Sequence, residues 1–268
     1  MERTATMTRT GWQRRLTPLL PTACLAIVAV VIWQAVVSIW RLPPILLPSP
    51  VAVVEAAWQW RTELIRGGLV TGAAALAGFA LSLIAGTLLA AVMSQSKMLR
   101  LAMYPYVILL QTVPIVAIAP LLVIWSGYEF RTVVLVTLII SLFPIINSVT
   151  EGLLAIPTDR LDLFRLYGAT RWQTLARLRV PTAVNHLMLG AKTSSGLAVI
   201  GAIVAEFFVG NGGANYSGLG TLMTGWQTLG RTAPLMAALA MSTLLGVILF
   251  GSVQLVSRTL LRRWTQYD

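Results

Sequence analysis

The sequence predicts an all-α protein embedded in a membrane, with about six transmembrane helices and a short cytoplasmic helical segment between the fourth and fifth. Of its 268 residues, 57% are apolar and only 11% are charged, whereas soluble proteins carry charge at about a quarter of their positions. Five stretches lack Asp, Glu, Lys and Arg, at 16–40, 67–96, 101–128, 132–150 and 232–257. Each can supply the roughly 20 apolar residues that cross a ~30 Å hydrocarbon core. The region 183–208 is the sixth candidate.

The distribution of basic residues supports this topology. With six spans and a cytoplasmic N-terminus, 14 of the 20 Lys and Arg residues lie on the inner side and five on the outer side. This is the positive-inside bias of multispan membrane proteins, and it places both termini in the cytoplasm. The net charge of +11 therefore reflects topology, and nucleic acid is not an expected partner.

The N-terminal part divides into a tail, an anchor and an outer helix. Residues 1–15 form a basic cytoplasmic tail, and residues 16–268 form a single transmembrane domain. The first span covers about 19–40. Ser49 and Pro50 suit the N-cap and first position of a helix, which runs to about residue 65 on the outer side.

The remaining spans carry small residues and prolines. The second span, about 67–94, contains Gly72, Gly78 and Gly86, which let helices approach closely in lipid. The third, about 98–126, contains Pro105, Pro114 and Pro120, and proline kinks a helix, so this span is expected to be bent or broken. The other predicted helices are three spans at about 131–156, 183–208 and 232–258, and a short helix at about 218–229.

The segment from 157 to 181 is basic and has helical periodicity. Leu161, Phe164 and Tyr167 recur every three residues and form one stripe of a short helix, which Thr158 or Asp159 can cap at its start. Gly168 is suited to end that helix in a left-handed conformation. A second helix at about 170–179 follows, with Trp172, Leu175 and Leu178 on one side, and Pro181 starts the fifth span. These features fit an interfacial helix packed on its own bundle or a docking helix for a soluble partner.

Few residues are available for catalysis. The chain has one cysteine, Cys24, and one histidine, His186. This excludes an internal disulfide and a multi-cysteine metal site, and leaves no partners for a catalytic triad. No phosphate-binding GxxxxGK[ST] loop occurs. The chain is therefore not expected to be an enzyme or to hold a metal.

Several motifs in order resemble one family. Gly168 and Pro181 have the thirteen-residue separation of the cytoplasmic EAA motif in permease subunits of type I ATP-binding-cassette (ABC) importers. Leu178–Pro181 stands at its Ile-x-Leu-Pro positions, and Asp162 stands at its acidic position. Leu163 and Phe164 depart from its two alanines. LLPSP at 46–50, TVPIVAIAPLLVIWSG at 112–127, AVIGAIVAEFF at 198–208 and GLGTLM at 218–223 resemble motifs of the nitrate, sulfonate and taurine branch.

The resemblance implies the type I importer permease fold, in a bacterial cytoplasmic membrane, and a division of labour between subunits. The chain would be one of two permease copies, usually a homodimer. A cytoplasmic ABC ATPase dimer would bind ATP and Mg, so no cofactor is expected here, and an extracytoplasmic binding protein would deliver the substrate. The segment 157–181, named the coupling segment below, would contact the ATPase through Asp162, Phe164, Arg165, Leu166, Tyr167, Gly168, Arg171 and Pro181.

The resemblance leaves the substrate open among sulfonates, taurine, nitrate, pyrimidine precursors and riboflavin. The sequence LFRLYGATRWQTL most resembles the corresponding segment of importers for pyrimidine vitamin precursors or riboflavin. We therefore expect a small polar or anionic solute or a vitamin precursor. A secondary transporter working without an ATPase is the alternative. It would usually show repeated halves with matching broken helices, which are not evident.

Polar residues within the spans are candidates for the solute pathway or for interhelical hydrogen bonds. Lys192 and Glu206 are 14 residues apart, about 21 Å along a helix, which excludes a direct ion pair. Lys192 is expected to extend toward lipid phosphates. Glu206 either lines the pathway or bonds to the loop at 209–217. The candidate pathway residues are Gln111, Thr112, Asn147, Ser194, Ser195 and Glu206.

Overall fold

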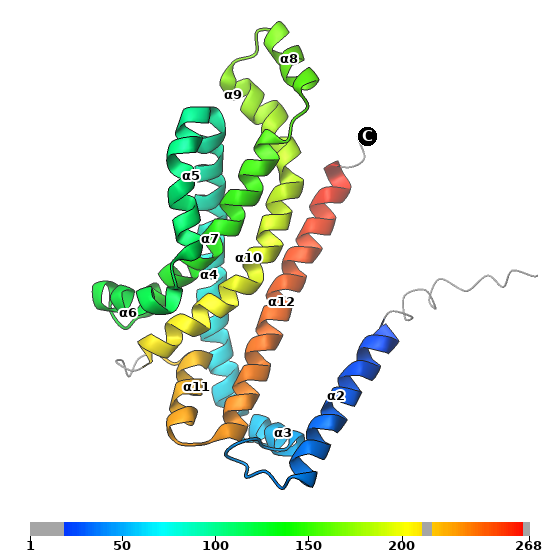
Figure 1. Cartoon of the computed structure of the whole chain (residues 1–268), viewed down its shortest axis with the longest axis vertical. Coiled ribbons are helices and arrows are strands. Elements are labelled where there is room, and N and C mark those ends of the chain that lie inside the picture. The colour runs from blue at the N-terminus through cyan, green and yellow to red at the C-terminus, as the bar shows by residue number, and fades with distance from the viewer. Residues whose placement is uncertain (1–18, 211–215, 265–268) are drawn as a thin grey trace, which may run out of the picture.

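The computed structural model describes residues 19–210 and 216–264, and within these ranges the chain is helical with no strand (Figure 1). The predicted tail at 1–15 lies outside the described residues. The helices are α2 (Leu19–Ile39), α3 (Pro50–Gln59), α4 (Arg61–Gln95), α5 (Lys97–Thr112), α6 (Ile115–Ser126), α7 (Phe130–Leu154), α8 (Thr158–Leu166), α9 (Arg171–Thr174), the π-helical turn η1 (Leu175–Arg179), α10 (Val180–Val209), α11 (Leu219–Thr228) and α12 (Thr232–Trp264).

The predicted spans correspond to four long apolar helices, one bent pair of helices and the separate helix α2. Four stretches are long and apolar enough to cross a membrane, at Arg61–Gln95, Phe130–Leu154, Arg171–Val209 and Thr232–Thr259. The pair α5 and α6 can form a fifth span, with a bend of 96° between the two helices. The first predicted span corresponds to α2, which lies away from α12 and the rest of the bundle (Figure 1). The long helices and the broken pair confirm an all-α polytopic protein.

The core forms where α4, α7 and α10 pack together, and small residues set their separation. A Cβ atom on Gly78 would lie 2.5 Å from the Cβ of Thr137 on α7, and one on Gly86 would lie 2.7 Å from Cγ2 of Ile145. The side chains around these contacts are buried, among them Ala75, Val133 and Ala202. The predicted close helix packing is thus confirmed at Gly78 and Gly86.

Gly78→Ala is expected to lower the thermal unfolding midpoint of the detergent-purified protein. The new methyl group would also lie 2.8 Å from the carbonyl oxygen of Val134, so backbone must move, and overpacking of this kind costs about 1–3 kcal/mol. Gly251→Ala on α12 is the matched control, because a Cβ there meets no atom within 4 Å. Equal midpoints for the two variants would contradict the tight α4–α7 contact.

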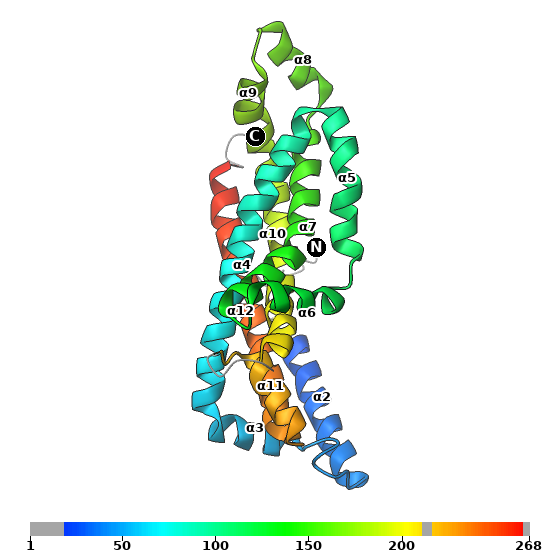
Figure 2. The same ribbon diagram turned by 90° about the vertical axis from the view of Figure 1, so that its left-hand side faces the viewer.

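The break between α5 and α6 confirms the prediction that proline interrupts this span. Val113 is extended, with φ −71° and ψ 122°, and Pro114 is the N-cap residue of α6. An extended conformation is what a residue before proline prefers. Pro105 and Pro120 lie inside helices. Figure 2 shows α6 running across the long helices, whereas α5 runs along them.

The outer helix begins as predicted but ends earlier. The Ser49 hydroxyl accepts a hydrogen bond from the Ala52 N–H at 3.2 Å, and Pro50 occupies the first turn. The helix ends at Gln59 rather than at about 65, and α4 starts at Arg61 rather than at 67. The indole N–H of Trp33 on α2 donates to the Pro48 carbonyl at 3.1 Å, which ties α2 to the start of α3.

Candidate functional site

The coupling segment begins with α8, whose C-terminus has the predicted glycine cap. Gly168 has φ +66°. Its N–H donates to the Arg165 carbonyl and the Ala169 N–H donates to the Phe164 carbonyl, both at 3.0 Å, which is the Schellman motif. The predicted start of the helix is wrong. The helix already includes Thr158, and no side chain caps it, because Pro157 occupies the N-cap position and has no side-chain acceptor.

The second half of the coupling segment runs without interruption into the fifth span. The Thr170 hydroxyl accepts from the Gln173 N–H at 3.2 Å, and the Gln173 side chain accepts from the Thr170 N–H at 2.8 Å. This capping box starts α9. Although the helix Arg171–Val209 is continuous, α10 begins at Val180 and Pro181 lies in its first turn, which confirms the predicted start of the fifth span. The wider π-helical turn just before it accommodates the missing N–H of proline.

Large apolar side chains are exposed at the tip of the coupling segment. Leu166 is 86% exposed, Tyr167 83% and Trp172 75%, and α8 and α9 project beyond the ends of the long helices (Figures 1 and 2). The three residues of the predicted apolar stripe therefore do not share one environment. Leu161 and Phe164 are half-buried, whereas Tyr167 follows the last residue of α8 and is exposed.

A groove of about 320 Å³ lies beside this tip. Phe164 and Tyr167 line it together with Leu163, Gln173 and Arg177. Asp162 forms an exposed ion pair with Arg165 at 3.0 Å. Arg165 and Arg171 line a separate cavity on the other side of the segment. The structure thus brings most of the predicted docking residues to one projecting element, and Pro181 lies outside it; their roles stay predictions.

A larger cavity of about 770 Å³ lies between α5, α7 and α10. Two predicted pathway residues, Gln111 and Asn147, line it. Two further polar residues, Ser148 and Thr193, line it as well. The sequence reasoning did not single them out, although each is adjacent to a residue that it named. The cavity is otherwise apolar, so its polar contacts with a solute would come from these amide and hydroxyl groups, although the Asn147 amide also donates to Glu151 at 2.9 Å and the Thr193 hydroxyl to the Leu189 carbonyl at 3.2 Å.

The other three hydroxyl candidates bond to helix backbone. Ser194 donates to the Ser141 carbonyl at 2.8 Å, which links α10 to α7. Thr112 donates to the Leu109 carbonyl at 3.1 Å and Ser195 to the Lys192 carbonyl at 2.7 Å. For Ser194 this is the interhelical bond that the sequence offered as an alternative to a pathway role.

Glu206 is fully buried and accepts hydrogen bonds from three elements. The Tyr216 hydroxyl donates to Oε1 at 2.7 Å, the Gly220 N–H of α11 donates to Oε2 at 2.7 Å, and the Thr71 hydroxyl of α4 lies 2.9 and 3.0 Å from the two oxygens. Thr71 also accepts from the Leu219 N–H at 2.8 Å. We call this group the Glu206 cluster.

The Glu206 cluster holds the N-terminus of α11. The carboxylate satisfies a free N–H of the first helical turn and lies at the positive end of the helix dipole, a place that the N-cap residue Gly218 leaves open. A Cβ on Gly218 would lie 2.0 Å from Oε1. Tyr216 belongs to the loop predicted at 209–217, so its bond to Glu206 matches the loop alternative for this residue. Its pathway role remains untested.

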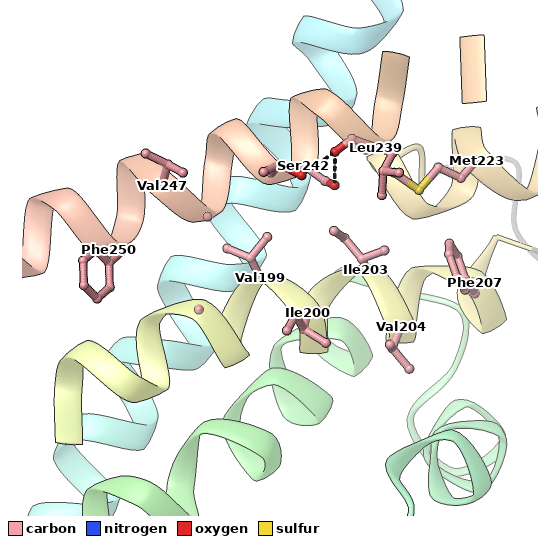
Figure 3. A pocket seen from close by; sticks show the side chains of 13 residues that line it. Val199, Ile200, Ile203, Val204, Phe207, Met223, Leu239, Ser242, Val247 and Phe250 are labelled. Atoms are coloured by element: carbon pink, nitrogen blue, oxygen red, sulfur yellow. Dashed lines mark hydrogen bonds between the residues drawn. The ribbon is translucent and has the colours of Figure 1, made fainter. Parts of the chain in front are cut away.

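Another groove, of about 540 Å³, lies between α10 and α12. Figure 3 shows Val199, Ile203 and Phe207 on one side and Leu239 and Val247 on the other. The Ser242 hydroxyl donates to the Leu239 carbonyl at 2.8 Å. The groove therefore offers an apolar surface and little that would orient a polar solute.

Long apolar helices, a cavity between them with a few polar groups and a projecting helical segment are features of a helical membrane transport protein. A model of the family described as "binding-protein-dependent transport system inner membrane component" matches residues 78–262. The chain belongs to this family, the permease subunits of type I ABC importers, with similarity to its sulfonate and nitrate branch.

Named relatives transport different solutes. The formylaminopyrimidine transport permease of Halalkalibacterium halodurans is 33% identical over 219 residues, covering 81% of this chain and 86% of that protein. The riboflavin transport permease of Chloroflexus aurantiacus is 32% identical over 234 residues, covering 87% and 85%. A crystal structure of an amino acid ABC transporter with histidines has a TM-score of 0.60 at 15% identity, covering 75% of this chain and 95% of that one, which shows the shared fold.

Proposed function

We propose that this protein is half of the membrane-embedded part of an ABC importer, driven by a cytoplasmic ATPase dimer that docks on the coupling segment. The observation that carries this is the exposed tip of α8, where Leu166 and Tyr167 lie almost entirely in solvent. Exposed apolar and aromatic side chains are typical of surfaces that bind another protein. Family membership supports an ABC system. ATP and Mg would bind to the ATPase.

We further propose that a second copy completes the membrane part and that an extracytoplasmic binding protein delivers the solute. The distribution of Lys and Arg supports an inner-membrane topology with both termini in the cytoplasm. Gln111 and Asn147 on the large cavity are the residues proposed to contact solute, with Ser148 and Thr193 beside them.

The proposed solute is a small polar molecule or vitamin precursor. The relatives named for formylaminopyrimidine, riboflavin, aliphatic sulfonates and nitrate support this class. These solutes all carry polar groups that can form hydrogen bonds with amide and hydroxyl side chains.

Co-expression with its ATPase is expected to give a complex that survives purification in detergent. Leu166→Ser should reduce the recovered ATPase at least threefold, because it removes an exposed apolar contact. Arg160→Ser is the matched control, since Arg160 is exposed on the same helix but lies outside the apolar tip. The yield of ATPase per permease, measured after affinity purification, tests the proposal. Equal yields from all three proteins would show that α8 is not the dock.

A further inference from the structure

A polar cavity of about 360 Å³ lies between the C-terminal end of α4 and the coupling segment, away from the large cavity between α5, α7 and α10. Its lining joins the end of α4 to α8, α9 and η1 through Gln95, Arg165, Arg171, Thr174 and Arg179. Three of these five side chains are guanidinium groups. We call this the arginine cavity.

The arginine cavity has a fixed wall. The Arg179 guanidinium donates a hydrogen bond to the carbonyl oxygen of Ser94, which holds it against the C-terminal turn of α4. The positive charges of Arg100 and Arg165 act on Arg179. Like charges held together in this way repel one another, so the arrangement gains stability when an anion enters.

Two of the three arginines that line the cavity, Arg171 and Arg179, have no carboxylate partner among the described residues. Among the residues that the structure describes, the two ion pairs are Glu129–Arg131 and Asp162–Arg165. Arg100, Arg171 and Arg179 therefore have no carboxylate partner in that part of the chain. Arg165 alone is paired, and its ion pair is exposed to solvent.

A buried donor points to the same kind of ligand. The side-chain nitrogen Nε2 of Gln95 is buried and has no hydrogen-bond partner within the described chain. A buried donor without an acceptor costs about 1–3 kcal/mol. A ligand that carries acceptor oxygens would satisfy Gln95 and the arginines together. Guanidinium groups bind phosphate oxygens through paired, charge-assisted hydrogen bonds.

We propose that the arginine cavity binds a phosphate group, supplied by an anionic phospholipid headgroup or by free inorganic phosphate. Neighbouring side chains favour the lipid. Met98 and Leu101, at the start of α5, follow the cavity residue Gln95 closely along the chain and are 82% and 65% exposed, so they offer an apolar surface for acyl chains. Anionic lipids are attracted to basic segments at the cytoplasmic surface. The bound phosphate would bridge the end of α4 and the coupling segment.

Native mass spectrometry of the full-length protein in detergent tests this proposal. One phosphatidylglycerol molecule is expected to bind at least tenfold more tightly than phosphatidylcholine with the same acyl chains. Arg171→Gln should weaken phosphatidylglycerol binding at least fivefold, and adding Arg179→Gln should weaken it further. Arg177→Gln is the matched control, because Arg177 is exposed on the same stretch of helix but lines the groove beside the tip and not the arginine cavity; phosphatidylglycerol binding by this variant should stay within twofold of the parent.

A separate titration with inorganic phosphate distinguishes the two sources. Phosphate that competes with phosphatidylglycerol in the parent, with affinity lost in Arg171→Gln, would identify free phosphate as a ligand of the same site. Arg171→Gln remains decisive if the double variant does not fold, because the Arg171 side chain makes no hydrogen bond or ion pair within the described residues. Equal loss in the Arg171 and Arg177 variants, or equal binding of both lipids without phosphate binding, would overturn the site. Arg165 and Arg171 are also predicted ATPase contacts, but lipid and phosphate binding are measured on the permease without the ATPase, so failure here leaves the proposed dock to its own test.

Discussion

Glu206→Ala is expected to release α11 from α4 and α10 and to lower the thermal unfolding midpoint by at least about 5 °C. The substitution removes the acceptor of the Tyr216 hydroxyl and of the Gly220 N–H, both in the buried Glu206 cluster. Each donor left without a partner costs about 1–3 kcal/mol. The Thr71 hydroxyl loses its acceptor as well, although it keeps the Leu219 N–H.

Two milder substitutions in the Glu206 cluster are expected to lower the unfolding midpoint by smaller amounts than Glu206→Ala. Tyr216→Phe removes one hydrogen bond and keeps the ring, so its midpoint should fall least. Glu206→Gln keeps one acceptor oxygen but places an N–H₂ group against a cluster of donors, so its midpoint should lie between the other two. This order follows from the number of acceptors lost.

Labelling of α11 separates a structural role of Glu206 from a pathway role. In a Cys24→Ser background, a cysteine at Met223 is the probe, because Met223 is only 6% exposed. Maleimide labelling should be slow in the parent and faster in Glu206→Ala. If Glu206→Gln changed transport kinetics while midpoint and labelling both stayed at the parent values, the carboxylate would belong to the pathway and not to a structural cluster.

Gly168→Asp is expected to uncouple transport from ATP hydrolysis and to lower transport at least tenfold. Gly168 has φ +66°, and a Cβ at this position meets no atom within 4 Å. The effect therefore comes from backbone conformation, which costs other residues about 1–2 kcal/mol, and from a new negative charge on the proposed dock.

Two matched substitutions separate these causes. Asn has nearly the shape of Asp and adopts the left-handed conformation more readily than most residues, so Gly168→Asn isolates the charge and should retain most transport. Val adds no charge but strains the backbone more, so Gly168→Val should shift the end of α8. Transport and ATP hydrolysis are measured on the same reconstituted complexes. Equal coupling in Gly168→Asp and the parent would remove this turn from the coupling pathway.

The helices and their approximate limits could be predicted because spans are long, free of charge and separated by polar residues. The position of the break in the third span was harder. Three prolines were candidates, and only Pro114 ends one helix and starts another, whereas Pro105 and Pro120 lie within helices. Which proline breaks a helix depends on packing against α7 and α10, and that information is not local in the sequence.

The candidate site was predictable where it depends on local chemistry. Gly168 closes α8 because only the backbone of that turn is involved. The Glu206 cluster was not predictable, because Thr71 lies 135 residues away along the chain and no local pattern pairs them. The one available signal was Gly218 and Gly220, which leave room for the carboxylate. Pro181 marked the start of α10 correctly, but no local pattern indicated the π-helical turn that joins α9 to it.

Solute uptake by proteoliposomes tests most directly whether this permease works only with an ATPase. The vesicles would contain the protein with its ATPase, with the binding protein outside and ATP inside, and the probes would be riboflavin, formylaminopyrimidine and taurine. Uptake of at least one probe is expected with ATP, with none when a non-hydrolysable analogue replaces ATP or the ATPase is omitted. Uptake at the full rate by the permease alone, without ATPase or ATP, would contradict the proposed function.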